Sequence, residues 1–115
     1  MSSLSTHVLD TAAGRPAEGV ALRLYASDQC GGGQELFRGR TDADGRCPAL
    51  RAAVLCKGMY RLEFDIGAYF TARGMTLADP PFLAMVPVLF GLGEDVHVHV
   101  PLLAAPYGYS TYRGS

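Results

Sequence analysis

Apolar and polar residues alternate with a period of two along several stretches of this chain. Residues 20–25 (VALRLY) and residues 60–65 (YRLEFD) both follow this pattern. Strict alternation is typical of a β-strand that buries one face, so both stretches are predicted to be half-buried strands. The predicted buried positions are Val20, Leu22, Leu24, Tyr60, Leu62 and Phe64.

Turn-forming sequences separate the alternating stretches. They read AAGRP, CGGG, DADG, CKG and GLGED, with the spacing expected of an all-β sandwich or barrel. The only helical signal is weak and lies near residues 69–78, and the glycines in DQCGGG indicate a flexible hairpin loop rather than a phosphate-binding loop. The chain is therefore predicted to be all-β, with residues 1–115 forming a single domain that has room for one core.

Composition and charge narrow the classes of function. The 115 residues are 49% hydrophobic and carry a net charge of −1, and Lys57 is the only lysine among the 10 basic residues. This balance argues against nucleic acid as the main partner. No apolar run of about 18 residues predicts a membrane span. The first residues do not read as a secretory signal, and the last three are not a peroxisomal address, so we expect a cytoplasmic protein without a membrane partner.

The last third of the chain is unusually apolar. Residues 76–115 hold only four charged side chains. We expect this part either to be deeply buried or to be covered by another subunit. The charged residues in it are Asp79, Glu94, Asp95 and Arg113.

The cysteines Cys30, Cys47 and Cys56 are odd in number and lack C-x-x-C spacing. Spacing of that kind is what metal-binding and redox motifs require, so no such role is predicted for them. We expect reduced thiols, as in cytosolic proteins. The sequence does not indicate any further role for these residues.

Two histidines share one face of a predicted strand in EDVHVHVPLL, residues 94–103. The valines point to one side of such a strand, and His97 and His99 point to the other. A short turn is predicted at residues 104–106, after which the tail YGYSTYRGS should return antiparallel to this strand. That arrangement would bring residues 112–115 beside residues 97–101, and the tail would be ordered because it is a strand of the sheet.

The same alternation in LSTHVLD places His7 on the face opposite Val8. All three histidines are therefore predicted to face outward. Histidine can exchange a proton near neutral pH, which suits proton transfer or metal ligation. A single outward histidine is more often structural or merely exposed. Three imidazoles also match the ligand set of a zinc site. Arg46, at the end of the turn TDADGR, would ordinarily be a solvated surface charge.

Six stretches resemble the 5-hydroxyisourate hydrolases of the transthyretin-like family, in order and over nearly the whole chain. The final YRGS is the most specific of them, because it is similar to the enzymes and not to the hormone carrier of the same fold. The stretches are LSTHVLD, GRTDADGR, MYRLEFDIGAYF, PPFLAMVPVLF, HVHVPLL and YGYSTYRGS.

The resemblance implies a two-sheet antiparallel transthyretin-like (prealbumin-like) sandwich with one short helix. It implies a homotetramer whose sites lie at the dimer–dimer interface. It also implies hydrolysis of 5-hydroxyisourate in urate catabolism, with ring opening to 2-oxo-4-hydroxy-4-carboxy-5-ureidoimidazoline and no cofactor. The residues implied are His7, Arg46 and His99 for catalysis, and Tyr112, Ser115, Arg113 and His97 for substrate binding.

Hydrolysis of a cyclic amide needs a base for water, a cation for the developing oxyanion and a proton for the leaving nitrogen. His7 and His99 are expected to supply the acid and the base, and Arg46 the cation. The sequence does not decide which histidine is the base. Two alternatives stay open: a transthyretin-like protein that binds an aromatic small molecule without changing it, and a zinc-binding hydrolase that uses the three histidines.

Overall fold

The computed structural model describes residues 1–27 and 33–114. The predicted hairpin loop at Gly31–Gly33 and the positions Cys30 and Ser115 therefore fall wholly or partly outside the described residues. The described elements, in chain order, are β1 (Ser3–Asp10), β2 (Arg15–Pro16), β3 (Ala21–Ala26), β4 (Glu35–Arg40), the 3-10 helix η1 (Pro48–Ala52), β5 (Gly58–Asp65), α1 (Ile66–Ala72), β6 (Met85–Leu92), β7 (His97–Ala105) and β8 (Gly108–Thr111).

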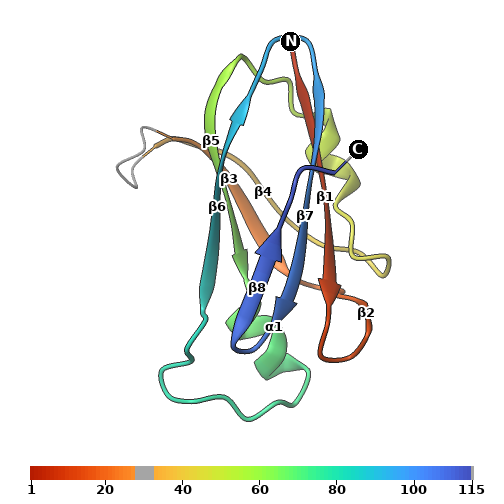
Figure 1. Cartoon of the computed structure of the whole chain (residues 1–115), viewed down its shortest axis with the longest axis vertical. Helices are drawn as coiled ribbons and strands as arrows, with labels where there is room; N and C mark the ends of the chain where they lie inside the picture. The colour runs from red at the N-terminus through yellow and green to blue at the C-terminus, as the bar shows by residue number, and fades with distance from the viewer. Residues whose placement is uncertain (28–32, 115) are drawn as a thin grey trace.

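Two four-stranded sheets face each other, as Figure 1 shows. One has the strand order β2-β1-β7-β8 and the other β4-β3-β5-β6. The predicted all-β sandwich with one short helix is confirmed. One strand pair is not antiparallel, because β1 and β7 run parallel to each other.

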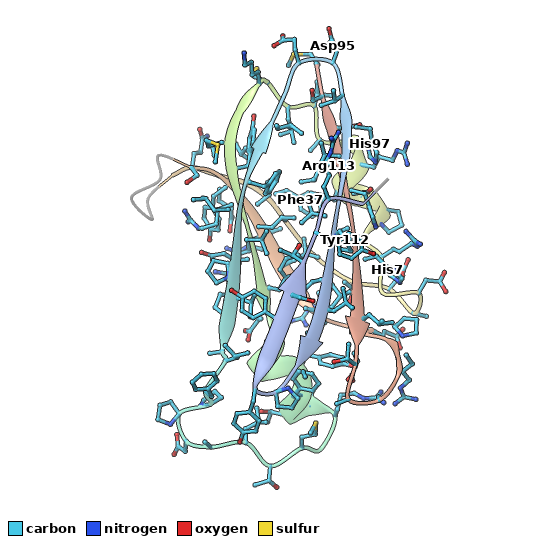
Figure 2. All side chains as sticks on the ribbon, in the orientation of Figure 1. His7, Phe37, Asp95, His97, Tyr112 and Arg113 are labelled. Carbon is cyan, nitrogen blue, oxygen red and sulfur yellow. The ribbon has the colours of Figure 1, made fainter. Side chains whose placement is uncertain are left out.

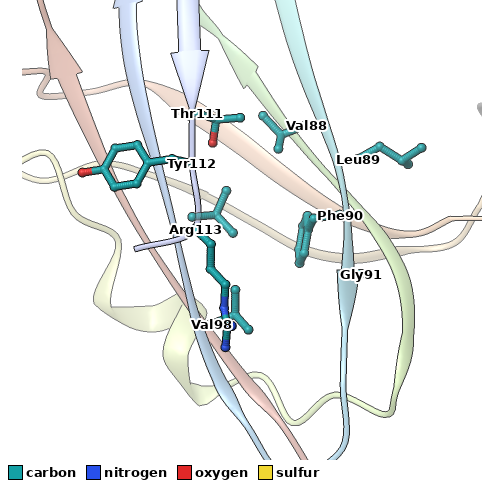
Figure 3. Close-up of a pocket in the computed structure, with 9 residues that line it drawn as sticks. Val88, Leu89, Phe90, Gly91, Val98, Thr111, Tyr112 and Arg113 are labelled. Atoms are coloured by element: carbon teal, nitrogen blue, oxygen red, sulfur yellow. The ribbon is translucent and has the colours of Figure 1, made fainter. Parts of the chain in front are cut away.

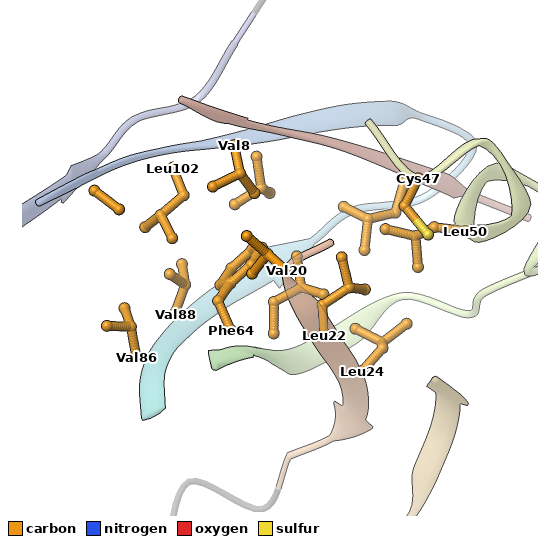
Figure 4. Close-up of a cluster of buried hydrophobic side chains, with 14 of the residues drawn as sticks. Val8, Val20, Leu22, Leu24, Cys47, Leu50, Phe64, Val86, Val88 and Leu102 are labelled. Atoms are coloured by element: carbon orange, nitrogen blue, oxygen red, sulfur yellow. The ribbon is translucent and has the colours of Figure 1, made fainter. Parts of the chain in front are cut away.

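The core lies between the sheets and is built from the inward positions of the alternating strands (Figure 4). Strand β1 alternates strictly between half-buried and buried residues, as does the first part of β3. The predicted burial of the apolar positions in residues 20–25 and 60–65 is confirmed. The largest fully buried side chains include Leu4, Leu22, Leu24, Leu62, Phe64, Phe70 and Leu102.

Helix α1 lies at one end of the sandwich and differs from the predicted position. It spans Ile66–Ala72, whereas the sequence signal was placed near residues 69–78. The helix starts earlier because the Asp65 carboxylate accepts a hydrogen bond from the Ala68 backbone N–H and caps the first turn. It stops before Gly74, which has φ of +87° and ends the helical path.

A buried hydrogen bond ties α1 to the first sheet. The Tyr69 hydroxyl donates to Asp10 Oδ2 at 2.8 Å, and both side chains are buried. Burial, followed by the bond to Asp10, raises the pKa of Tyr69 to about 12. The phenol therefore stays neutral and keeps donating across the ordinary pH range.

The C-terminal tail is a strand, as predicted. Strand β8 pairs antiparallel with β7, from Ala105 opposite Gly108 to Leu102 opposite Thr111. The predicted turn at residues 104–106 is wrong by about two residues, because β7 continues to Ala105 and a two-residue turn follows it. Beyond β8 the tail makes one further bridge, between His99 and Gly114.

The outward sides of the last strands remain partly apolar. Strand β6 alternates between exposed and buried residues along most of its length, and all four residues of β8 are exposed. The apolar last third of the chain is thus divided between the core and the surface. Its exposed large side chains include Phe82, Met85, Leu89, Tyr107, Tyr109 and Tyr112. In the described part of the chain, no helix is long and apolar enough to cross a membrane.

Candidate active site

The outer side of the sheet β2-β1-β7-β8 carries all three histidines, and we call it the histidine face. The outward positions of β1 alternate with buried ones, which turns His7 away from the core. Buried Val98 and Val100 do the same for His97 and His99 on β7. The predicted orientation of the histidines is confirmed, and Figure 2 shows His7 and His97 projecting from this sheet.

The parallel register of β1 and β7 places small residues beside two of the histidines. Ser3 lies opposite His97 and Ser5 lies opposite His99. The Ser5 hydroxyl is 2.8 Å from His99 Nδ1 and 2.9 Å from His97 Nε2. The Ser3 hydroxyl is 2.7 Å from His97 Nδ1. Both ring nitrogens of His97 are therefore held by serines, whereas His99 is held at Nδ1.

Arg46 reaches the same face through a tightly constrained turn. Asp42 Oδ1 accepts hydrogen bonds from the backbone N–H groups of Asp44 and Arg46. Gly45 has φ of +75°, and a side chain there would clash with the carbonyl oxygen of Val8. Glycine thus lets the turn approach β1, where the Gly45 carbonyl accepts from the Val8 N–H at 2.8 Å.

This contact brings Arg46 beside His7, with which it forms an isolated β-bridge. Arg46 is exposed, so its guanidinium is available to a ligand. A groove of about 220 Å³ runs along this side of the chain. It is lined by Ser5, Thr6, Arg46, Cys47, Pro48 and Arg51.

The C-terminal tail approaches His99 from the other side. The Gly114 N–H donates to the His99 carbonyl at 2.8 Å. A Cβ added to Gly114 would lie 2.5 Å from His99 Cδ2, so glycine allows the tail to pass directly against the imidazole. Ser115 therefore directly follows, in the sequence, a residue that contacts His99.

Two of the predicted substrate-binding residues, Tyr112 and Arg113, line one cleft at the open edge of the two sheets. Figure 3 shows the Tyr112 ring directed over β7 and away from β6, whereas Arg113 extends along β7 toward Val98. Both residues line this mostly apolar cleft of about 260 Å³, together with Val88 and Phe90 of β6. Neighbouring residues of the tail thus send their side chains in different directions at this edge.

The electrostatic surroundings of His99 favour its neutral form. Burial lowers the pKa of the His99 imidazole below its ordinary value, and the positive charges of Arg46, His7 and His97 lower it further. A histidine that is neutral at neutral pH can accept a proton, which general base catalysis requires. The arrangement can therefore combine a base, His99, with a permanent cation, Arg46.

Of the two described cysteines, only Cys47 lines the groove beside Arg46. Cys47 is buried, and that burial raises the pKa of its thiol, while Cys56 is an exposed thiol. Within residues 1–27 and 33–114, no three His, Cys, Asp or Glu side chains converge closely enough to hold a metal ion. Two of the histidines, His97 and His99, instead lie within hydrogen-bond distance of Ser3 and Ser5.

Sequence reasoning missed Ser3, Ser5 and Arg51. Arg51 lies in the last turn of η1 and lines the groove with Arg46. The sequence pattern could have indicated the two serines, because Ser3 and Ser5 precede His7 at intervals of two residues and so share its outward side of the strand. Their pairing with His97 and His99 needed the parallel register, which joins residues more than 90 positions apart.

Comparisons with known proteins agree with this geometry. Residues 4–114 match the model of the HIUase/Transthyretin family. The chain is 52% identical to a 5-hydroxyisourate hydrolase of Caulobacter vibrioides over the full length of both chains. It is also similar to the solved structure of a Klebsiella pneumoniae 5-hydroxyisourate hydrolase, with 41% identity, full coverage of both chains and a TM-score of 0.83.

A transthyretin is also similar to this chain, at lower identity. A sea bream transthyretin solved in complex with thyroxine has 32% identity and a TM-score of 0.82, over 96% of this chain and 93% of its own. The hydrolase and the transthyretin are thus both similar in structure to this two-sheet sandwich.

Proposed function

This chain belongs to the HIUase/Transthyretin family, and on that premise we propose that it is an enzyme that hydrolyses 5-hydroxyisourate. The observation that carries the proposal is the meeting of His7, Arg46 and His99 on one face, with the tail in contact with His99. An aromatic-ligand carrier has no need for acid–base groups at such a place. The ring of the substrate would open to give 2-oxo-4-hydroxy-4-carboxy-5-ureidoimidazoline.

We assign the base to His99. Its lowered pKa keeps Nε2 free to take a proton from water while that water attacks the carbonyl beside a ring nitrogen. The Arg46 guanidinium stabilises the oxyanion that develops on the carbonyl, and its planar fork suits a urea-like ring. His7, adjacent to Arg46, protonates the leaving nitrogen. The reaction uses no cofactor.

The remaining predicted residues serve binding. Tyr112 offers a hydroxyl and an aromatic surface to the substrate ring, and Ser115 makes hydrogen bonds with the ring. The contact between Gly114 and His99 supports this role for the end of the chain. Arg113, which lines a cleft together with Tyr112, contributes its positive charge to substrate binding.

The site is completed by assembly. We propose one domain per chain and a homotetramer with sites at a dimer–dimer interface. A second histidine face would cover the groove beside Arg46. Exposed apolar side chains on the edge strands, such as Leu89 and Tyr109, support further contacts between copies. The exposed thiol of Cys56 suits a reducing compartment, and we propose the cytoplasm.

The test generates 5-hydroxyisourate in solution by oxidising urate and follows its ultraviolet absorbance. The chain should accelerate the decay far beyond the spontaneous rate, and a chain shortened after Thr111 should lose most of this acceleration. If the decay stays at the spontaneous rate while an aromatic ligand raises the melting temperature, the chain is a carrier. Loss of activity on treatment with a chelator would favour the zinc hydrolase.

A further inference from the structure

Four side chains on the histidine face form a continuous chain of hydrogen bonds. Ser3 contacts His97 Nδ1, His97 Nε2 contacts Ser5, and Ser5 contacts His99 Nδ1, at 2.7, 2.9 and 2.8 Å. The parallel pairing of β1 with β7 fixes this order, since Ser3 and Ser5 lie opposite His97 and His99. This series of hydrogen bonds begins at Ser3 and exposed His97 and ends at half-buried His99.

The chain has a defined direction because a serine hydroxyl has a single proton. Ser5 can donate to only one of its two imidazole neighbours, and it must accept from the other. If Ser5 donates to His97 Nε2, then His99 carries its proton on Nδ1 and has a free lone pair on Nε2. If Ser5 donates to His99, the free lone pair on Nε2 is lost. The hydroxyl of Ser5 therefore couples the protonation of the two rings.

Resting on the proposed hydrolase function, we propose that Ser5 and His97 form a proton relay behind His99. In the resting enzyme, His97 carries its proton on Nδ1 and donates it to Ser3, Ser5 donates to His97 Nε2, and His99 donates from Nδ1 to Ser5. Nε2 of His99 is then the base that faces the water. Ser5 and His97 are positioning residues, because they act through His99.

The bonds broken and formed and the charges balance when the relay operates during the attack of water. An O–H bond of water breaks and an Nε2–H bond of His99 forms, while the hydroxide adds to the substrate carbonyl. The Nδ1–H bond of His99 breaks as a new O–H bond of Ser5 forms, and the old O–H bond of Ser5 breaks as the Nε2–H bond of His97 forms. His99 ends neutral, and the positive charge resides on His97.

The location of the charges explains why such a relay helps. The positive groups near His99 are Arg46 from the turn, His7 from β1 and His97 from β7, and together with burial they lower the pKa of His99. A proton that stayed on His99 would be repelled by Arg46 and His7 in a partly buried place. His97 is exposed, so water solvates the charge once it has moved there.

The test compares Ser5→Thr with Ser5→Val, because threonine and valine have the same shape and suit a strand equally, while only threonine has the hydroxyl. Histidine ¹⁵N NMR, recorded well above the ordinary histidine pKa of about 6.5, reports which ring nitrogen holds the proton. The wild type and Ser5→Thr should hold it on Nδ1 of His99, and Ser5→Val should shift it to Nε2.

Catalysis should follow the tautomer. Ser5→Thr should keep kcat within about threefold of the wild type, whereas Ser5→Val should lose about tenfold or more, as when partners of other functional histidines are removed. The rates are also measured in mixtures of H₂O and D₂O. A plot of the wild-type rate against the deuterium fraction of the solvent should be curved, because several protons move together. The same plot for Ser5→Val should be a straight line.

Equal tautomers in the two variants, equal losses of kcat, or a straight line for the wild type would each overturn the relay. An Nε2–H tautomer of His99 in the wild type would also overturn it. If the wild type does not accelerate the decay of 5-hydroxyisourate, the proposed function fails instead, and the tautomers of the Thr and Val variants still decide whether Ser5 sets the protonation of His99.

Discussion

Replacing Gly114 with alanine should displace the His99 imidazole, because the tail passes directly against this ring. The added Cβ would lie 2.5 Å from His99 Cδ2 and 3.1 Å from both Cβ and Cγ. Carbon atoms pack comfortably at about 3.5 Å, so either the ring or the tail must move by about 1 Å. The backbone bond from Gly114 to the His99 carbonyl, at 2.8 Å, resists movement of the tail.

The expected cost follows from this displacement. A misplacement of about 1 Å in a catalytic group can lower the rate by about 100-fold. That loss corresponds to about 2.7 kcal/mol of transition-state stabilisation. Folding should be nearly unaffected, since Gly114 lies beyond the last strand and outside the core. The decay of 5-hydroxyisourate gives kcat/KM, and a thermal melt gives the stability of the same sample.

Gly108→Ala is the matched control. It lies in the same tail, and a Cβ there would have no atom within 4 Å. Gly108→Ala should keep nearly full activity, while Gly114→Ala loses most of it. If the two variants differ by less than about threefold in kcat/KM, the close approach of Gly114 to His99 has no catalytic importance and the reasoning is refuted.

Three further outcomes are expected. Tyr69→Phe removes the hydroxyl that donates to Asp10 Oδ2, while the Ala13 N–H still donates to Oδ1. The loss at the buried Oδ2 should cost about 1–3 kcal/mol and lower Tm by roughly 4–12 °C in a melt near pH 7. His99 must be neutral to act as a base, and its pKa is lowered, so kcat/KM should persist as pH falls through 6.5 and decline only at lower pH. Because the charge of Arg46 contributes to the lowered pKa of His99, Arg46→Gln should move this decline toward higher pH. Leu89→Asp, on the exposed side of β6, should shift sedimentation toward smaller species and reduce activity in parallel.

Each of these outcomes has a control or a contrary result. Tyr107→Phe removes a hydroxyl from an exposed ring and should leave Tm unchanged, so an equal loss in both tyrosine variants would remove the special role of the buried pair. An acidic limb centred at or above 6.5 in the wild type would contradict the assignment of His99 as the base. Full activity in a Leu89→Asp monomer would show that one chain holds a complete site.

The unfolded chain ionises tyrosine near pH 10, whereas Tyr69 in the folded chain does so at about 12. Stability that depends on the neutral phenol is therefore complete below pH 10 and is lost as pH rises through 10 to 12. The same loss should be smaller in Tyr69→Phe, as alkaline melts of the two proteins would reveal.

Local alternation was sufficient to predict the orientation of the histidines. In a strand, the side-chain direction repeats every two residues, so Val98 and Val100 in the core require His97 and His99 to face outward. The return of the tail beside β7 was predicted from a short turn at residues 104–106, and the pairing is as predicted although the turn itself follows Ala105.

Contacts between distant segments were not predictable in this way. The bridge from His7 to Arg46 depends on how the turn at residues 42–46 packs on β1, and the serine contacts depend on the parallel register of β1 with β7. The start of α1 had a readable signal in Asp65, whose capping bond outweighed the weak helical preference of the following residues. Arg113 was grouped with its neighbours in YRGS, although successive residues of an extended tail point in different directions.

The most informative experiment compares the initial rates of 5-hydroxyisourate decay for the wild type and His99→Asn at equal protein concentration. Removal of a general base typically costs 10²- to 10⁴-fold, and asparagine keeps much of the shape of the imidazole. We expect rapid decay with the wild type and a loss of at least about 100-fold with the variant, with unchanged Tm. Decay at the spontaneous rate in both samples, or equally rapid decay in both, would contradict hydrolysis through the histidine face.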